Sequence, residues 1–242
     1  MLPVDFHCHT TFSRCGIHSV MEMLLEARTR GLAGLAITDH GPELRSRVSS
    51  TFFERLRDPL PGIRMLRGIE ANFCGTDGDI DVPLEWVHWM DIVLLGIHPN
   101  TAQGLGVDVY TRMVVTAIGK YPCIDILAHL NDPAYPVDFD AVARAASAKG
   151  VVVELNNSKT ELARAGDDVT LALLAACERA KCRIAVNSDA HAINEVGCDS
   201  AARALIVKAG FPETLIVNSR AITAFAFVEE RRVNKVGTAP VA

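Results

Sequence analysis

Seven short apolar segments, each followed by a longer stretch of helical periodicity, constrain the fold of this 242-residue chain more than any other feature. The segments are nearly continuous in Val, Ile, Leu and Ala, without the alternation of a half-exposed strand. That pattern is typical of parallel strands buried on both faces. The segments cover residues 2–6, 34–38, 63–69, 92–97, 124–128, 151–155 and 183–187. The sequence therefore predicts an α/β protein with a parallel sheet.

Segments with helical periodicity separate these predicted strands. The first begins with the capping box Ser19-Val20-Met21-Glu22 and ends before Gly31. Further helices are predicted at about 43–57, 108–119, 138–149, 168–181, 195–209 and 219–231. No linker or low-complexity tract divides the chain, and barrels of this size commonly form one unit. We therefore expect a single domain over residues 1–242, with its last helix at 219–231 and a flexible tail at 232–242.

A polar, mostly metal-ligating side chain follows each predicted strand. The first of each set lies at position 7, 40, 70, 98, 129, 156 and 189, so that the gaps are 33, 30, 28, 31, 27 and 33 residues. A strand, a crossover helix and two loops need about 30 residues. In a parallel barrel these side chains would converge on the C-terminal rim of the strands, where active sites form. The residues are His7, His9, His40, Glu70, His98, His129, Asn156, Asn157, Asp189 and His191.

Six of the eight histidines belong to this predicted rim. Without cations, so many imidazoles and carboxylates in one pocket would leave buried polar groups unpaired and would crowd like charges. Histidine with carboxylate is the ligand set of zinc, manganese or iron in hydrolytic sites. Alternate residues of an extended chain point to the same side, so His7 and His9 can reach one ion while Cys8 packs away from it. The sequence therefore predicts a metal centre.

Composition and charge argue against several other classes of protein. The chain has 24 Lys and Arg against 29 Asp and Glu, a net charge of −5, whereas proteins that hold a nucleic-acid backbone normally carry a basic surplus. Seven cysteines without regular spacing predict no disulfide framework and indicate a reducing compartment. No segment has the pattern of a signal peptide or of a membrane-spanning helix. We expect a cytoplasmic protein that binds neither membranes nor long nucleic acids.

The successive motifs resemble those of the PHP (polymerase and histidinol phosphatase) superfamily, and their spacing is most similar to its YcdX-type phosphatase branch. The motifs are Asp5-Phe6-His7-Cys8-His9-Thr10, Ile37-Thr38-Asp39-His40-Gly41, Arg67-Gly68-Ile69-Glu70, Gly96-Ile97-His98, Leu127-Ala128-His129, Glu154-Leu155-Asn156-Asn157-Ser158 and Asn187-Ser188-Asp189-Ala190-His191. This resemblance implies a distorted (β/α)7 TIM-like barrel with a trinuclear metal site at the C-terminal rim. It also implies phosphoesterase chemistry.

The resemblance further implies how the ligands share three divalent metal ions, with zinc as the first expectation and manganese or iron as alternatives. One ion would be held by His7, His9, Glu70 and Asp189, a second by Glu70, His98 and His129, and the third by His40, His191 and a residue of the loop after Thr10. At that loop position this sequence has Cys15 where the resembling branch has His. Three outcomes stay open: ligation by Cys15, whose thiolate is a competent zinc ligand, ligation by His18, or an altered third site.

The implied reaction is hydrolysis of a small phosphate monoester, in which a metal-activated hydroxide attacks phosphorus in line. We assign the catalytic step to Glu70, Asp189 and His191. Arg164 and Lys159 lie in segments expected to overhang the rim and are predicted to bind the substrate phosphate.

Three further residues have narrower predicted roles. Asp5 and Asp39 precede ligand histidines and are predicted to orient imidazole N–H groups, with solvated or helix-capping carboxylates as the alternative. His88 lies between two tryptophans in the sequence Trp86-Val87-His88-Trp89, and we expect it to be structural.

Other functions also fit parts of this pattern. A nucleotide phosphatase or exonuclease of the same superfamily is the first alternative, and a non-catalytic metal-binding regulatory module is the second. An amidohydrolase also begins with a His-x-His motif, but it usually has a modified lysine where this sequence has His98. The sequence leaves a homo-oligomer open.

Overall fold

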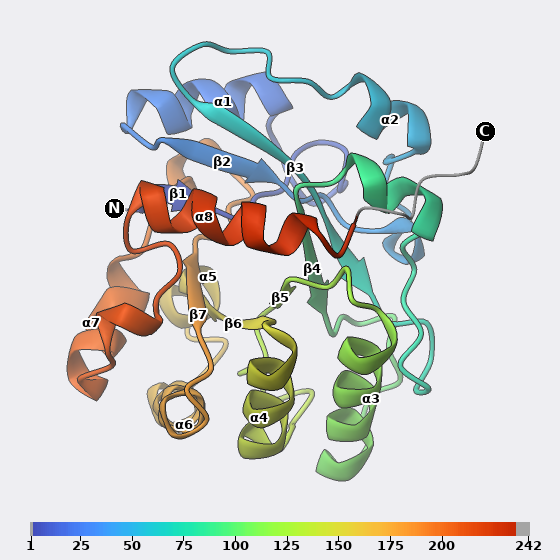
Figure 1. Cartoon of the computed structure of the whole chain (residues 1–242), viewed down its shortest axis with the longest axis vertical. Coiled ribbons are helices and arrows are strands. Elements are labelled where there is room, and N and C mark those ends of the chain that lie inside the picture. Colours follow the sequence, from blue (N-terminus) through green and yellow to red (C-terminus); the bar gives the residue numbers. More distant parts are fainter. Residues whose placement is uncertain (1, 236–242) are drawn as a thin grey trace.

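The seven apolar segments form seven parallel strands that pair in chain order, β1-β2-β3-β4-β5-β6-β7, in a computed structural model that describes residues 2–235 (Figure 1). The strands are β1 (Val4–Asp5), β2 (Gly34–Ile37), β3 (Arg64–Asn72), β4 (Ile92–Gly96), β5 (Ile126–Leu127), β6 (Val152–Asn156) and β7 (Ile184–Asn187). Nearly every strand residue is buried, as the continuous apolar runs predict. The predicted distorted (β/α)7 TIM-like barrel is confirmed.

The barrel closes between its first and last strands by two different devices. Beyond the C-terminal ends of β1 and β7, Cys8 and Ala190 form an isolated parallel bridge, and the His9 N–H donates to the Ala190 carbonyl at 2.8 Å. At the N-terminal ends, the Asn218 side chain donates to the carbonyls of Val4 and Val186, at 3.0 and 2.6 Å. A side chain thus replaces strand pairing on this edge, which is one source of the distortion.

The helices surround the barrel, except for the last one, which lies across one end of it. They are α1 (Val20–Thr29), α2 (Ser50–Arg55), α3 (Val107–Lys120), α4 (Phe139–Lys149), α5 (Asn157–Glu161), α6 (Asp167–Arg179), α7 (Ser200–Ala209) and α8 (Ala221–Arg232), with short 3-10 helices η1 (Pro42–Leu44), η2 (Leu84–Trp89), η3 (Ile193–Glu195) and η4 (Glu213–Leu215). Within residues 2–235, no helix is long and apolar enough to cross a membrane.

Two of the predicted helices are shorter than their sequence patterns suggest. The segment predicted at 43–57 is interrupted because Arg45 takes a left-handed conformation (φ 55°), and α2 restarts only where Ser49 accepts a hydrogen bond from Phe52 N. The segment predicted at 195–209 begins as α7 at Ser200, because Gly197 also has a positive φ of 69°.

Helix α8 closes the N-terminal end of the barrel, as Figure 1 shows in red. Its residues Ala224, Phe227 and Val228 pack against side chains that fill the barrel, such as Phe6 and Leu66. The opposite rim is therefore the open end. Helix α8 lies at the position of the helix expected at 219–231.

The segment after α8 continues in ordered contact with the barrel. Lys235 is buried, and its Nζ lies 2.7 Å from an Asp125 carboxylate oxygen. Of the tail expected to be flexible from 232 onward, Lys235 thus contacts the barrel, and residues 236–242 lie outside the described residues.

Arg231 carries a buried charge at the closed end of the barrel. Its guanidinium donates to Asp125 Oδ1 at 3.0 Å and to the carbonyls of Lys149, Pro122 and Ile124 at 2.7–3.0 Å. Removing one partner of a buried ion pair costs about 3–5 kcal/mol. We therefore expect Arg231→Ala to lower the free energy of unfolding by about that amount in a denaturant titration.

Arg179 provides the control for this prediction, because its ion pair with Asp140 is exposed. Arg179→Ala should cost less than about 1 kcal/mol. A loss of similarly small size for Arg231→Ala would contradict the anchoring role of the buried guanidinium.

Candidate metal centre

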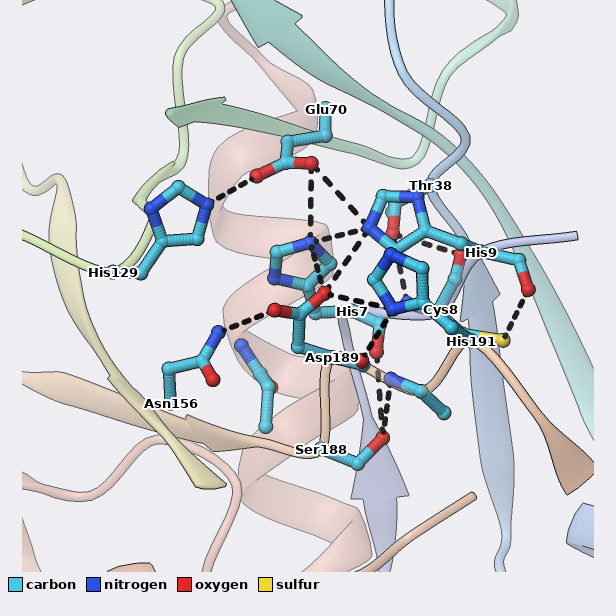
Figure 2. Close-up of polar contacts among 12 residues, drawn as sticks. His7, Cys8, His9, Thr38, Glu70, His129, Asn156, Ser188, Asp189 and His191 are labelled. Carbon is cyan, nitrogen blue, oxygen red and sulfur yellow. Dashed lines mark hydrogen bonds and ion pairs between the residues drawn. The ribbon is translucent and has the colours of Figure 1, made fainter. Parts of the chain in front are cut away.

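The open rim of the barrel gathers nine potential ligands from the ends of six strands. They are His7, His9 and Cys15 after β1, His40 after β2, Glu70 in β3, His98 after β4, His129 after β5, and Asp189 and His191 after β7. Figure 2 shows His7, His9, Glu70, His129, Asp189 and His191 among them. Glu70 differs from the sequence expectation, because β3 continues past it to Asn72. Its side chain still points to the centre, since the strand runs along the barrel wall.

The Glu70 carboxylate lies at the middle of this group. Its Oε1 is 2.8 Å from His129 Nε2 and 3.1 Å from His98 Nε2, and its Oε2 is 2.8 Å from His40 Nδ1. The side chain is 1% exposed. Glu70 therefore bridges two sides of the rim.

Two buried atoms where Glu70 meets His40 have no hydrogen-bond partner within residues 2–235. Glu70 Oε2 and His40 Nδ1 are close together, but their geometry is not that of a hydrogen bond, and both are buried. An unpaired buried carboxylate oxygen is costly unless a cation or a donor satisfies it. A metal ion would satisfy both atoms, so the residues present fit the predicted metal.

His40, Glu70 and His98 form one group of ligand atoms that could hold an ion, and His7, His9 and Asp189 form a second. The Nε2 atoms of His7 and His9 face each other at 3.0 Å, and Asp189 Oδ1 lies 3.4 and 3.2 Å from them. Figure 2 shows these atoms pointing toward one another. Facing imidazole nitrogens beside a carboxylate are suited to a shared cation.

Cys15 joins a third group, with His9, His40 and His191, whose ligand atoms all lie within 4.8 Å of one another. The loop that carries Cys15 is fixed on both sides. Ile17 N donates to the His191 carbonyl at 3.0 Å, and Gly16 passes so close to the Thr10 backbone that a Cβ would clash there.

The other two residues considered near this loop lie outside the three groups. His18 Nδ1 faces the Ile193 N–H at 3.4 Å. Cys8 is buried in the apolar cluster with Met23 and Leu24, away from the ligands, as expected.

The electrostatics of the third group favour a thiolate. Burial raises the pKa of the Cys15 thiol, but contacts with His191 and His40 outweigh it and lower the pKa to about 6. Burial lowers the pKa of His40, yet the Glu70 carboxylate and Cys15 raise it to about 10. For His191, the contact with Cys15 and the Asp189 charge likewise overcome burial and raise the pKa to about 9. Without an ion, the thiolate and the neighbouring carboxylates are therefore balanced by protonated imidazoles, the positive charge that a bound cation would supply instead.

Two of the candidate ligands have unusual backbone conformations. His129 has φ 35° and Asp189 has φ 56°, values that L-residues with bulky side chains rarely adopt. Such strain persists only where surrounding contacts hold it, and it concentrates at functional sites. The structure thus maintains both residues in positions that an unconstrained chain would avoid.

The buried aspartates next to ligand histidines do not orient imidazoles directly. Asp39 accepts from the N–H and hydroxyl groups of Thr10 and Ser13, and Ser13 Oγ in turn lies 2.9 Å from His9 Nδ1. Asp5 accepts from Ser188 and from backbone N–H groups, including that of Gly197. The prediction of direct imidazole contacts is wrong for both, because their side chains point into the turns that follow the strands.

Sequence reasoning missed Glu154, which does contact an imidazole. Its Oε1 lies 2.7 Å from His7 Nδ1, and both side chains are wholly buried. In the sequence, Glu154 stands out only as a carboxylate inside an otherwise apolar strand. It lies two residues before Asn156 and therefore on the same face of β6.

The predicted phosphate-binding residues belong to none of the ligand groups. Lys159 is half-buried on α5 and pairs with Asp132 at 2.8 Å. Arg164 is exposed in the loop after α5. The Lys159 charge is thus already paired, and a role of either residue in phosphate binding stays a prediction.

The remaining polar candidates have structural contacts. Asn156 Nδ2 donates to Asp189 Oδ2 at 3.0 Å (Figure 2), and its Oδ1 caps α5. Asn157 Oδ1 accepts from the N–H groups of Ala201 and Ala202 at the start of α7. The ring of His88 packs on Trp89 at 4.0 Å, outside the ligand groups.

A parallel barrel with histidine, carboxylate and thiol ligands on its C-terminal rim has the architecture of a metal-dependent hydrolase. The PHP domain model matches residues 5–126. A "probable phosphatase" from Caldicellulosiruptor bescii is 33% identical over 231 residues, which cover 94% of this chain and 96% of that protein. A "probable phosphatase" from Shewanella sediminis is 35% identical over 233 residues, 94% of each chain. The chain belongs to the PHP family, as its motifs indicate.

Solved structures show the same fold at lower identity. Histidinol phosphate phosphatase from Lactococcus lactis, complexed with zinc, L-histidinol and phosphate, superposes with a TM-score of 0.63 at 16% identity, covering 86% of this chain and 94% of that one. A chain from archaeal ribonuclease P with mature tRNA has a TM-score of 0.58 at 16% identity, covering 95% and 91%. The fold is thus shared by proteins with different tasks, so function has to be argued from the site.

Metal binding to these groups should stabilise the folded chain. A ligand that binds only the native state at 100 times its dissociation constant adds about 2.7 kcal/mol per site. Adding zinc to chelator-treated protein should therefore raise the melting temperature measured by calorimetry, and the rise should shrink in His7→Ala. An unchanged melting temperature at saturating zinc would contradict a metal centre.

Proposed function

We propose that this protein is a metal-dependent phosphoesterase that hydrolyses a small phosphate monoester at a trinuclear site. The observation that carries the proposal is the set of three overlapping ligand groups on one rim, joined through His9 and His40. The phosphatase names of relatives that align over nearly the whole chain support the reaction class. The zinc and phosphate named with the Lactococcus lactis structure support the same chemistry.

The proposed ligand sets follow the resemblance to the family. His7, His9, Glu70 and Asp189 hold the first ion, Glu70, His98 and His129 hold the second, and Cys15, His40 and His191 hold the third. The contacts of Glu70 with His98, His129 and His40 support its role as the bridging ligand. Zinc is the proposed metal, because the set combines imidazole, carboxylate and thiolate donors.

Divalent ions in such a site supply positive charge to the phosphoryl oxygens and lower the pKa of water. The chain itself fixes the orientation of the surrounding groups. Asp189 is held by Asn156, and the His191 Nδ1–H donates to the Asp189 carbonyl at 2.9 Å, so Nε2 is the nitrogen that can serve as a ligand atom. The His191 side chain is 34% exposed, far more than Glu70. Together with Glu70, these two residues are therefore the proposed catalytic residues.

Lys159 and Arg164 are the proposed substrate-binding residues. Both are cationic and lie on α5 or in the loop that follows it, next to the strand that supplies Asn156. A phosphate dianion at the rim would offer Lys159 an alternative partner to Asp132. The net charge of −5 favours a small substrate over a long nucleic acid.

Loss of a ligand should abolish the reaction. His7→Ala or Asp189→Ala should reduce metal-dependent phosphate release from an aryl phosphate by about 100-fold or more, beyond the usual effect of residues that only support ligands. His88→Ala is the control, because His88 lies outside the ligand groups, and its rate should be unchanged. Full activity in His7→Ala would overturn the proposal, and degradation of single-stranded DNA in place of phosphate release would point to a nuclease.

Ligation by Cys15 has a spectroscopic signature of its own. Cobalt-substituted protein should show a thiolate-to-cobalt charge-transfer band that disappears in Cys15→Ser and persists in Cys198→Ser. The metal content should fall from three ions per chain to two in Cys15→Ala. A spectrum that is identical in wild-type and Cys15→Ser protein would show that Cys15 is not a ligand.

A further inference from the structure

Glu154 is a fully buried carboxylate in the middle of β6 that the proposed ligand sets do not use. Each of its two oxygens accepts two hydrogen bonds. Oε1 accepts from His7 Nδ1 at 2.7 Å and from Asn187 Nδ2 at 2.8 Å, and Oε2 accepts from His129 N at 2.9 Å and from Asn156 Nδ2 at 3.0 Å. A carboxylate that is surrounded by four donors is satisfied only in its ionised form.

The contact with His7 determines which ring nitrogen faces the centre. Because His7 Nδ1 carries the proton that it donates to Glu154, the lone pair of the neutral ring, the form that binds a metal, lies on Nε2. That atom is the one that faces His9 Nε2 at 3.0 Å and Asp189 Oδ1 at 3.4 Å. Glu154 therefore selects the tautomer of His7 that can bind a cation at the rim.

The other two contacts reach further ligands. The His129 N–H is held by Glu154 in the left-handed conformation that brings His129 Nε2 within 2.8 Å of Glu70. Asn156 Nδ2 donates both to Glu154 and to Asp189 Oδ2, each at 3.0 Å. One carboxylate is thus linked to ligands that follow β1, β5 and β7.

We propose that Glu154 is the positioning residue of the metal centre, fixing the tautomer of His7, the backbone of His129 and, through Asn156, the carboxylate of Asp189. This inference rests on the metal centre of the proposed function but not on the reaction that it catalyses. Glu154 belongs to none of the ligand groups, and it acts through the ligands that it contacts.

The test compares Glu154→Gln with a matched control, Asp125→Asn. Asp125 is also fully buried, and it lies at the closed end of the barrel, where it accepts from Val93 N and pairs with Arg231. Both variants replace a buried carboxylate by an amide and should lower the melting temperature. In Glu154→Gln the new NH₂ group must also face two donors, so the hydrogen bonds on that side are lost.

Zinc affinity, measured by competition with a chelator in the absence of substrate, distinguishes a positioning role of Glu154 from the general effect of replacing a buried carboxylate. We expect Glu154→Gln to bind zinc 10- to 100-fold more weakly, the usual loss for an outer carboxylate partner of a metal ligand, and Asp125→Asn to bind as tightly as the wild type. Equal zinc affinity in Glu154→Gln and the wild type would overturn the proposal. A protein that binds zinc as predicted but hydrolyses no phosphate ester would refute the proposed function alone.

If Glu154→Gln does not fold, a measurement on the wild type decides. Nitrogen NMR of the histidine rings in the zinc-loaded protein should show the proton of His7 on Nδ1. A proton on Nε2 would overturn the proposal, because Glu154 would then not direct the ligand atom.

Discussion

The Glu70 carboxylate, buried on the rim among imidazoles from four other strand ends, is the interaction on which the rest of the centre depends. A charge in this position is stable only if the surrounding groups compensate it. The ring nitrogens of His40, His98 and His129 lie within 3.1 Å of it, and His7 lies at 3.4 Å. Cations would satisfy the carboxylate and the imidazoles together. Burial, charge and ligand chemistry therefore all indicate metal binding.

The two ends of the barrel have different tasks: one seals the apolar interior, and the other presents the polar ligands. At the closed end, α8 seals the apolar interior, and Arg231 satisfies Asp125 with a direct ion pair. At the open end, ligands project from strand ends, and the polar residues behind them, such as Asp39 and Glu154, fix turns and ring orientations. The ligands therefore lie at one end of the barrel, and a sealed apolar end with a structural ion pair lies at the other.

Most of the fold could be predicted from the sequence, because strands buried on both faces leave continuous apolar runs that recur with the βα period. Local helix boundaries could not be predicted, because hydrophobic periodicity does not reveal the turns in which Arg45 and Gly197 take left-handed conformations. The ligands after each strand were recognisable by type and phase. Glu154 was not, because only the folded barrel shows that a carboxylate inside β6 meets the Nδ1 atom of His7, far away in the sequence.

The central claim is that this rim hydrolyses small phosphate esters with bound metal. The most direct test is phosphate release by the wild-type protein from a panel of small phosphate monoesters, assayed after loading with zinc, manganese or iron and again after chelation. We expect turnover of at least one ester, lost on chelation and restored by metal. No release from any ester with any of the three metals, or an equal rate after chelation, would contradict it.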